Sequence, residues 1–305
     1  MDRISTAQQV RQSIDLITDR QTELGDLQKQ ITTGKRVLKP SDDPSASAQI
    51  ERSRSDVARL DVEARMVSFA KLKLSQAEGA VAEGTEVFQR SREILLAANN
   101  DSSSPEDREL YAHELRSLRD QLFNMANRSD GLGGYIFAGA GTRQEPFVEG
   151  ANGIEYRADA GRQLTGERTE LSTSVDGRYL FGTSSGAGVE AVFDIMNDVA
   201  SALEDTGMDS VLLHTNVSAA LDDIDAAMNR FSGVRAELGE QMVMADLAEQ
   251  SLAAGQELAT QRLSSLSGVD MAEAISSMQA KSTQLDAAMQ TYAQISGLSL
   301  FNYIR

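Results

Sequence analysis

The chain has 305 residues, with 46 acidic and 29 basic side chains and a formal net charge of −17. Nucleic-acid and anionic-membrane binding both need clustered Lys and Arg, so this balance argues against either as a partner. The chain has no Cys and only two histidines, His113 and His214, far apart in sequence. Disulfides, thiol catalysis and thiolate metal sites are therefore excluded, and a zinc site is disfavoured.

The first predicted element is a helix over residues 2–33. Its opening residues, MDRISTAQQVRQS, place no apolar stretch behind the early Arg, so no secretory signal peptide is predicted. Its seam positions recur at alternating steps of three and four, which favours a coiled coil over an ordinary amphipathic helix. They are Ala7, Val10, Ile14, Ile17, Gln21, Leu24, Gln28 and Ile31.

A turn follows this helix over residues 34–45. Gly34 suits the left-handed position just past a helix end. Asp43 and Pro44 are typical of the N-cap and first position of the next helix. The pair Asp42 and Asp43 could suggest a metal, but no further ligand follows at useful spacing, so a cap and turn explain it better.

Two further helices are predicted before the middle of the chain. The first runs from about residue 44 to 98, and the second restarts at Ser104 and Pro105 after a break at residues 99–101. The first keeps the three-four alternation at Val67, Ala70, Leu74, Ala77, Val81, Gly84, Phe88, Ser91, Leu95 and Ala98. The second shows it at Tyr111, Leu115, Leu118, Leu122 and Met125.

The composition changes between residues 131 and 188, which are rich in Gly, Thr, Ser and Arg. Short runs of alternating polarity, at 134–139, 153–159, 167–175 and 178–183, are typical of strands. The dipeptides Asn152-Gly153 and Asp176-Gly177 are hairpin signals. The sequence therefore predicts a small antiparallel β domain inserted between helices.

Helix is expected again from about residue 189, with a long run over 209–266 and a last helix that begins near Asp270 and ends at Gly297. Asp270 and Glu273 occupy capping-box positions. The last helix carries a heptad seam at Met271, Ile275, Met278, Ser282, Leu285, Met289 and Tyr292.

The predicted fold is mainly α, with long N- and C-terminal helices paired in a coiled coil, a helical bundle domain and a small inserted antiparallel β domain. The expected domains are an inner assembly domain (1–38 with 268–305), a bundle (39–130 with 189–267) and an outer domain (131–188). The two terminal seams are expected to pair with each other, because each helix alone would expose an apolar stripe to water. The candidate assembly residues are Val10, Ile14, Ile17, Leu24, Ile31, Met278, Leu285, Met289, Tyr292, Leu300 and Phe301.

The sequence does not match the known catalytic and ligand-binding motifs considered below. The Gly-rich stretch 138–144 lacks the GK[ST] of a phosphate loop, and neither a GxSxG nor an HExxH motif occurs. The cluster Asp222, Asp223 and Asp225 lacks the Gly and distant Glu of a calcium loop. Carboxylate pairs are plentiful, but none stands out as glycosidase machinery. We therefore predict no catalytic residue, no metal and no cofactor.

Four segments resemble the hook-associated protein 3 family of flagellar hook–filament junction proteins, within the flagellin superfamily. They are RIST (3–6), the turn segment 31–50 with Gly34, Lys35, Arg36, Asp42, Asp43 and Pro44, the segment 130–147, and the C-terminal segment 269–304 ending in SLFNYI. Asp2 departs from the family's usual start. Flagellin itself is the nearest alternative, followed by a non-flagellar scaffold or adhesin and by an enzyme.

This resemblance implies a structural role and not an enzyme. The implied protein leaves the cell unfolded through the flagellar type III apparatus and acts outside the cell in the flagellum. Its implied partners are further copies of itself in a ring, another hook–filament junction protein, flagellin and an export chaperone. The chaperone would cover the apolar stripe near Leu285, Met289 and Tyr292.

Overall fold

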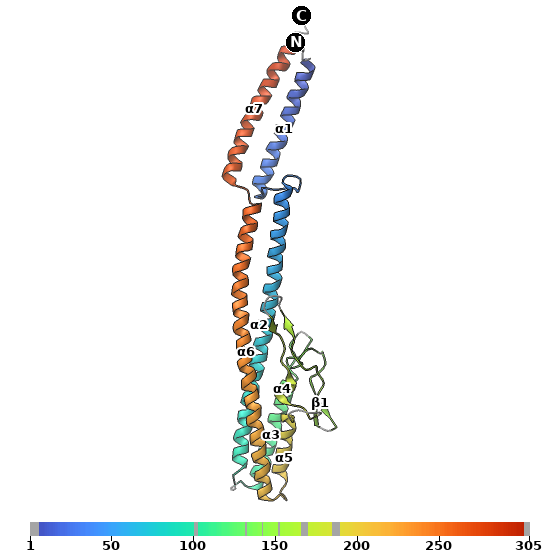
Figure 1. The fold of residues 1–305 in the computed structure, drawn as a ribbon, viewed down its shortest axis with the longest axis vertical. Helices are drawn as coiled ribbons and strands as arrows, with labels where there is room; N and C mark the ends of the chain where they lie inside the picture. Colours follow the sequence, from blue (N-terminus) through green and yellow to red (C-terminus); the bar gives the residue numbers. More distant parts are fainter. Residues whose placement is uncertain are drawn as a thin grey trace. The chain divides into compact units, whose positions relative to one another are not determined.

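The structure is a computed structural model of the chain, and it describes residues 6–100, 103–131, 133–141, 143–151, 153–165, 170–184 and 190–301. Within these residues it is mainly helical (Figure 1). The N-terminal half holds α1 (Thr6–Thr33), α2 (Pro44–Ala98) and α3 (Pro105–Ala126). The middle holds β1 (Phe147–Gly150), β2 (Gly153–Tyr156), β3 (Leu164–Thr165), β4 (Leu171–Ser172) and α4 (Gly177–Phe181). The chain ends with α5 (Val192–Glu204), α6 (Ser210–Ser267) and α7 (Met271–Phe301).

The chain divides into two compact units, each of which is described by itself. The terminal unit consists of residues 1–60 and 255–305, and the central unit of residues 61–254. The long helices α2 and α6 each contribute residues to both units. The terminal unit contains α1 and α7, which lie side by side with the start of α1 and the end of α7 at the same end of the pair (Figure 1).

The central unit is built on α2, α3, α5 and α6. All ten seam positions predicted for α2, from Val67 to Ala98, are buried, which confirms the helical period. The Phe88 ring of α2 meets the Phe231 ring of α6 edge to face, with centroids 4.9 Å apart. Gly84 permits this approach, because a Cβ there would lie 2.5 Å from Cε1 of Phe231.

Helices α3 and α5 pack against each other in the same unit (Figure 1). The α3 helix begins as predicted, since Ser104 and Asp107 form a reciprocal capping box, with the Asp107 amide donating to Ser104 Oγ at 3.1 Å. Its predicted seam residues Leu115, Leu118, Leu122 and Met125 are buried and Tyr111 is half-buried. Phe123 of α3 contacts Phe193 of α5 edge to face, with centroids 5.6 Å apart.

The inserted region contains two small antiparallel sheets. In the first, β1 pairs with β2 from Phe147 opposite Tyr156 to Gly150 opposite Gly153, which confirms a hairpin at the predicted place. Gly153 has a positive φ of 107°, and Asn152 lies outside the described residues. In the second sheet, β3 pairs with β4. The run 134–139, expected as a strand, forms only isolated bridges such as Ala138 with Asp176.

Two predictions in the inserted region and the last helix are wrong. The run 178–183 was predicted as a strand after an Asp176-Gly177 hairpin, but it forms the short helix α4, and Asp176 caps it by accepting from the Arg178 amide at 3.0 Å. The last helix was predicted to end at Gly297, but α7 continues to Phe301. A Gly inside a helix costs only about 1 kcal/mol relative to Ala, which neighbouring residues can offset.

The core of the central unit is a cluster of aromatic rings. Phe181 is its centre, with centroids 5.2 Å from both Phe137 and Phe147, 5.5 Å from Phe193 and 5.2 Å from Phe231. All five rings are fully buried, and they come from the inserted region and from α5 and α6. The insert is therefore fixed to the helices by a shared hydrophobic core. No helix in the described residues is both long and apolar enough to cross a membrane.

Candidate assembly site

The α1–α7 pair brings together part of the seam predicted for each helix. Ile17, Leu24 and Ile31 of α1 are half-buried, as are Met278, Leu285 and Tyr292 of α7. Lys281 of α7 forms an ion pair with Glu23 of α1. The hydrogen bond from Lys281 lowers the pKa of the Glu23 carboxyl below its ordinary value.

The contacting faces are rotated slightly from the predicted seams. On α1 the positions with reduced exposure include Ser13, Ile17, Arg20, Leu24, Leu27 and Ile31, and on α7 they include Ala274, Met278, Lys281, Leu285, Ala288 and Tyr292. Ser282 is half-buried as well, whereas the other predicted seam members whose side chains are described are exposed and lie at the rim of the contact. Among them, Ile14 is 46% exposed, Ile275 50% and Met289 43%.

Three predicted assembly residues lie outside the part whose side chains are described. Val10 belongs to α1, and Leu300 and Phe301 belong to α7, by their backbone alone. A two-helix contact buries only one side of each helix, because residues three and four apart form a single stripe. The described apolar side chains at the rim of the pair are therefore free to contact a further partner.

The turn residues predicted from the sequence form the start of α2. Gly34 has a φ of +67°, as its place after α1 requires. Asp42 Oδ2 accepts from the amides of Leu38 at 3.2 Å and Lys39 at 2.8 Å, which closes the turn. Asp43 Oδ1 accepts from the Ala46 amide at 2.9 Å, so it caps the helix that Pro44 begins. This hydrogen bond lowers the pKa of the Asp43 carboxyl.

The same turn is joined to the chain between α6 and α7, which sequence reasoning missed. The Arg36 amide donates to the Ser267 carbonyl at 2.8 Å, and the Val269 amide donates to the Gly34 carbonyl at 3.1 Å. Lys35 and Gly268 form an antiparallel bridge between these bonds. A Cβ at Gly268 would lie 2.6 Å from the Ser264 carbonyl, so this position needs Gly.

Asp270 begins α7 directly after this bridge. Its Oδ1 accepts from the Ala272 amide at 2.9 Å and the Glu273 amide at 3.1 Å. The terminal unit therefore connects the end of α1, the start of α2, the end of α6 and the start of α7 through one set of backbone hydrogen bonds. The one sequence signal for this backbone junction was Gly268, followed two residues later by the capping residue Asp270.

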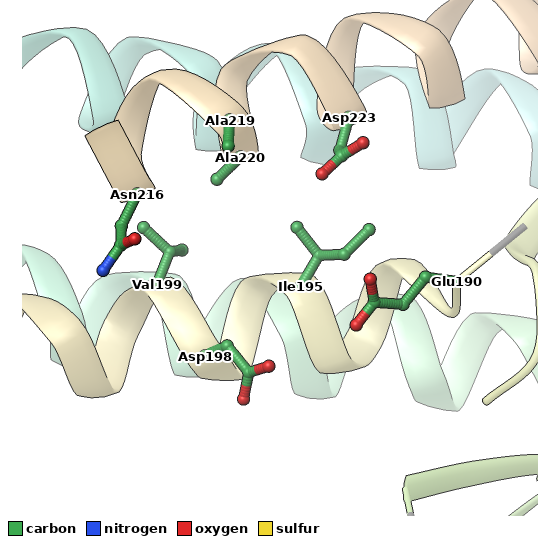
Figure 2. A pocket seen from close by; sticks show the side chains of 8 residues that line it. All are labelled: Glu190, Ile195, Asp198, Val199, Asn216, Ala219, Ala220 and Asp223. Carbon is green, nitrogen blue, oxygen red and sulfur yellow. The ribbon is translucent and has the colours of Figure 1, made fainter. Parts of the chain in front are cut away.

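A second candidate, an acidic groove, lies in the central unit between α5 and α6. It has a volume of about 250 Å³, and Figure 2 shows Glu190, Asp198 and Asp223 around a floor that includes Ile195 and Val199. Burial and the neighbouring carboxylates raise the pKa of Glu190 above its ordinary value. Within the described residues no group of three or more His, Cys, Asp or Glu could hold a metal ion.

Comparison with known proteins first defines the class. The bacterial flagellin N-terminal helical region matches residues 4–142, and the bacterial flagellin C-terminal helical region matches residues 221–304. The chain is thus a flagellin-like protein.

The particular family follows from relatives that match the chain from end to end. Flagellar hook-associated protein 3 of Escherichia coli is 33% identical, over 98% of both chains, and that of Salmonella typhimurium is 31% identical, over 99% of this chain and 100% of the relative. The chain belongs to the flagellar hook-associated protein 3 family. A flagellin of Bacillus subtilis is only 24% identical over 87% of both chains.

Solved structures share the fold. A FlgL of Xanthomonas campestris matches 70% of this chain and 99% of its own with a TM-score of 0.62 at 20% identity. The flagellar junction protein FlgL from Legionella pneumophila matches 72% of this chain and 100% of its own with a TM-score of 0.58 at 17% identity. By its family, the chain is a structural component of the extracellular bacterial flagellum at the hook–filament junction.

Proposed function

We propose that this hook–filament junction subunit enters the flagellum through its α1–α7 pair, whose rim is completed by neighbouring copies. The observation that carries the proposal is the exposure of predicted seam residues at that rim, with Ile14, Ile275 and Met289 each close to half exposed. These residues continue the heptad pattern, yet one partner helix cannot cover them. Further copies arranged as a ring would do so.

The energetics favour ordering on assembly. Full burial of a Leu, Ile or Met side chain stabilises by about 1.5–3 kcal/mol, and half-burial realises only part of that. Ordering the backbone of each residue costs roughly 1–2 kcal/mol. The free subunit therefore keeps its terminal helices only loosely paired, and neighbouring copies supply the missing burial.

Loose pairing of the terminal helices in the free subunit is also compatible with export in an unfolded state and with protection by an export chaperone. A chaperone would cover the apolar stripe near Leu285, Met289 and Tyr292 before export and release it at assembly. The other junction protein and flagellin would then meet the two ends of the assembled ring. In this scheme the protein acts by binding alone, with no catalytic step.

The test is a single charge placed in the α1–α7 contact. Leu285→Asp should reduce incorporation into isolated flagella by at least about tenfold, since burying one unpaired carboxylate costs several kcal/mol. Thr283→Asp is the matched control, because Thr283 is exposed and lies two residues, or about 200°, around α7 from Leu285. Incorporation is measured by immunoblot of flagella, and far-UV circular dichroism checks that the remaining helices fold.

Normal incorporation of Leu285→Asp, at the level of Thr283→Asp, would refute the proposal. A deletion of the gene supplies the second arm. It should leave complete hooks without filaments and release flagellin into the medium, whereas altered but persistent filaments would favour the flagellin alternative.

A further inference from the structure

The part of the chain that forms α5 and the first half of α6 is acidic and lacks compensating cations of its own. Residues 179–229 contain nine acidic residues and neither Lys nor Arg. The nine are Glu190, Asp194, Asp198, Glu204, Asp205, Asp209, Asp222, Asp223 and Asp225. Cations of other helices neutralise two of them, since Arg116 pairs with Glu204 and Arg92 pairs with Asp225 at 2.8 Å.

Four of the remaining carboxylates gather near the start of α5, and we call Glu190, Asp194, Asp198 and Asp223 the α5 carboxylate cluster. Figure 2 shows Asp223 pointing from α6 toward α5, on whose side Glu190 and Asp198 line the same groove of about 250 Å³. These three residues are exposed, whereas Asp194, one turn after Glu190, is half-buried. Within the described residues no Lys or Arg forms an ion pair with any member of the cluster.

Asp194 also fastens the insert to α5. Its Oδ2 accepts from the Ile154 amide of β2 at 3.2 Å and from the Ser184 hydroxyl. The approach is close, because a Cβ at Gly153 would lie 2.6 Å from the same oxygen. One carboxylate thus joins β2, the segment after α4 and the first turn of α5.

The charges that act on Glu190 are all negative within the described residues. They are Asp194 and Asp198 of α5 and Asp223 of α6. Burial first, and then these carboxylates, raise the pKa of Glu190 above its ordinary value. Asp223 also acts on Arg230, seven residues along α6, but that guanidinium donates to a main-chain carbonyl of α4.

Asp194 has one cation among the charges that act on it. Burial raises the pKa of its carboxyl, and Asp198 and Glu149 of β1 add to this rise. The Ile154 amide and Arg119 of α3 oppose the rise. Arg119 is shared, because it also binds Glu149 at 2.9 Å. At neutral pH the ionised Asp194 is therefore held in this contact at an electrostatic cost.

We propose that the start of α5 is a proton-responsive contact, in which protonation of Glu190 and Asp194 tightens α5 against β2 and α6. Both carboxyls bind protons more strongly in the folded chain than in the unfolded chain, because their folded pKa values are raised. Stability therefore falls as pH rises through these folded pKa values, and the added stability is present in mild acid. The flagellum lies outside the cell, so this contact takes the pH of the medium. The inference is independent of the α1–α7 contact.

The test is urea unfolding of the full chain over a series from about pH 7.5 to about pH 5, where carboxyls with raised pKa values begin to take up protons. Near-UV circular dichroism follows the packed aromatic side chains of the central unit. Low ionic strength is used, because salt screens repulsion between exposed charges. The series stops above the sequence pI of about 4.6, since chains without net charge precipitate.

The variants are Glu190→Gln and the double variant Glu190→Gln, Asp194→Asn, in which the Asn amide oxygen can still accept from the Ile154 amide. The control is the double variant Glu86→Gln, Glu240→Gln. It removes two exposed carboxylates of α2 and α6 and changes the net charge by the same amount.

The urea midpoint of the natural chain should rise toward acid pH. Glu190→Gln should raise the midpoint at the neutral end of the series, the double variant should raise it further, and both differences should close toward the acid end. The control should change the midpoint less and by the same amount at every pH, because exposed carboxylates stay ionised throughout. If the double variant weakens the hydrogen bonds of Asp194, Glu190→Gln decides, since Glu190 forms none among the described residues. A pH dependence of Glu190→Gln equal to that of the natural chain would overturn the proposal.

Discussion

At the scale of single residues, the connection between α2 and the inserted region depends on a buried ion pair. Lys73 of α2 binds Asp130, and their side chains are 13% and 8% exposed. Asp130 Oδ1 also accepts from the Gly134 amide at 2.9 Å, at the entry to the insert. The Lys73 ammonium lies 5.5 Å from the centre of the Phe69 ring. One cation thus holds the first turn of the insert against α2.

Lys73→Met should destabilise the central unit by about 3–5 kcal/mol, because it leaves a buried carboxylate without its cation. The double variant Lys73→Met, Asp130→Asn should recover a large part of this loss, since an amide oxygen can still accept from Gly134. Urea unfolding followed by circular dichroism measures both. Equal stability of the single and double variants would show that the ion pair is not the cause.

At the scale of elements, α4 joins the insert to the helical core. The Phe181 ring at its end is in contact with rings from β1, α5 and α6. The Arg230 side chain of α6 donates from Nε to the Leu180 carbonyl at 3.3 Å, and burial lowers the pKa of this guanidinium. Figure 1 shows α4 beside the long helices of this unit. The insert and the helices should therefore unfold together.

Phe181→Ala should lower the free energy of unfolding by about 3–5 kcal/mol, as expected for removal of a fully buried ring. Tyr179→Ala, in the same helix, is the control, because Tyr179 is 59% exposed. Its effect should stay within roughly 0.5 kcal/mol. The comparison uses urea midpoints with the slope checked for change. A similar loss of stability in the two variants would contradict the conclusion that the Phe181 ring joins the insert to the helical core.

The helices were predictable from the sequence, whereas the insert was predictable only in part. Heptad spacing located α2 from Pro44 to Ala98, and capping residues located its start and that of α3. The run containing Phe181 alternates like a strand, but five aromatic rings converge there and Asp176 caps a helix instead. Tertiary packing overrides a short local pattern of this kind.

The assembly site was likewise predictable from the sequence only in part. Spacing alone pointed to the facing sides of α1 and α7, because a seam is a local property of each helix. The joint between Arg36 and Ser267 was not predictable, since the two residues are far apart in sequence and bond through backbone atoms that every residue carries. The rotation of the contact face also depends on both helices at once.

At the scale of the whole molecule, the two units should differ in stability. The described core is concentrated in the central unit, which holds the aromatic cluster, whereas the α1–α7 pair contributes mostly half-buried side chains. Regions with few buried apolar contacts open locally at low free energy. We therefore expect the terminal unit to be partly open in the free subunit and closed after assembly.

Limited trypsin digestion of the free chain should therefore cut α1 and α7 first, at sites such as Arg11, Lys29 and Lys281, and leave a fragment that contains the aromatic core. The initial cleavage in α1 and α7 should be faster by roughly tenfold or more, which corresponds to about 1.4 kcal/mol in opening free energy. In isolated flagella the same sites should resist digestion, because neighbouring copies cover them. If α1 and α7 of the free chain resist trypsin as well as the central unit does, ordering on assembly is wrong and the terminal pair is already stable alone.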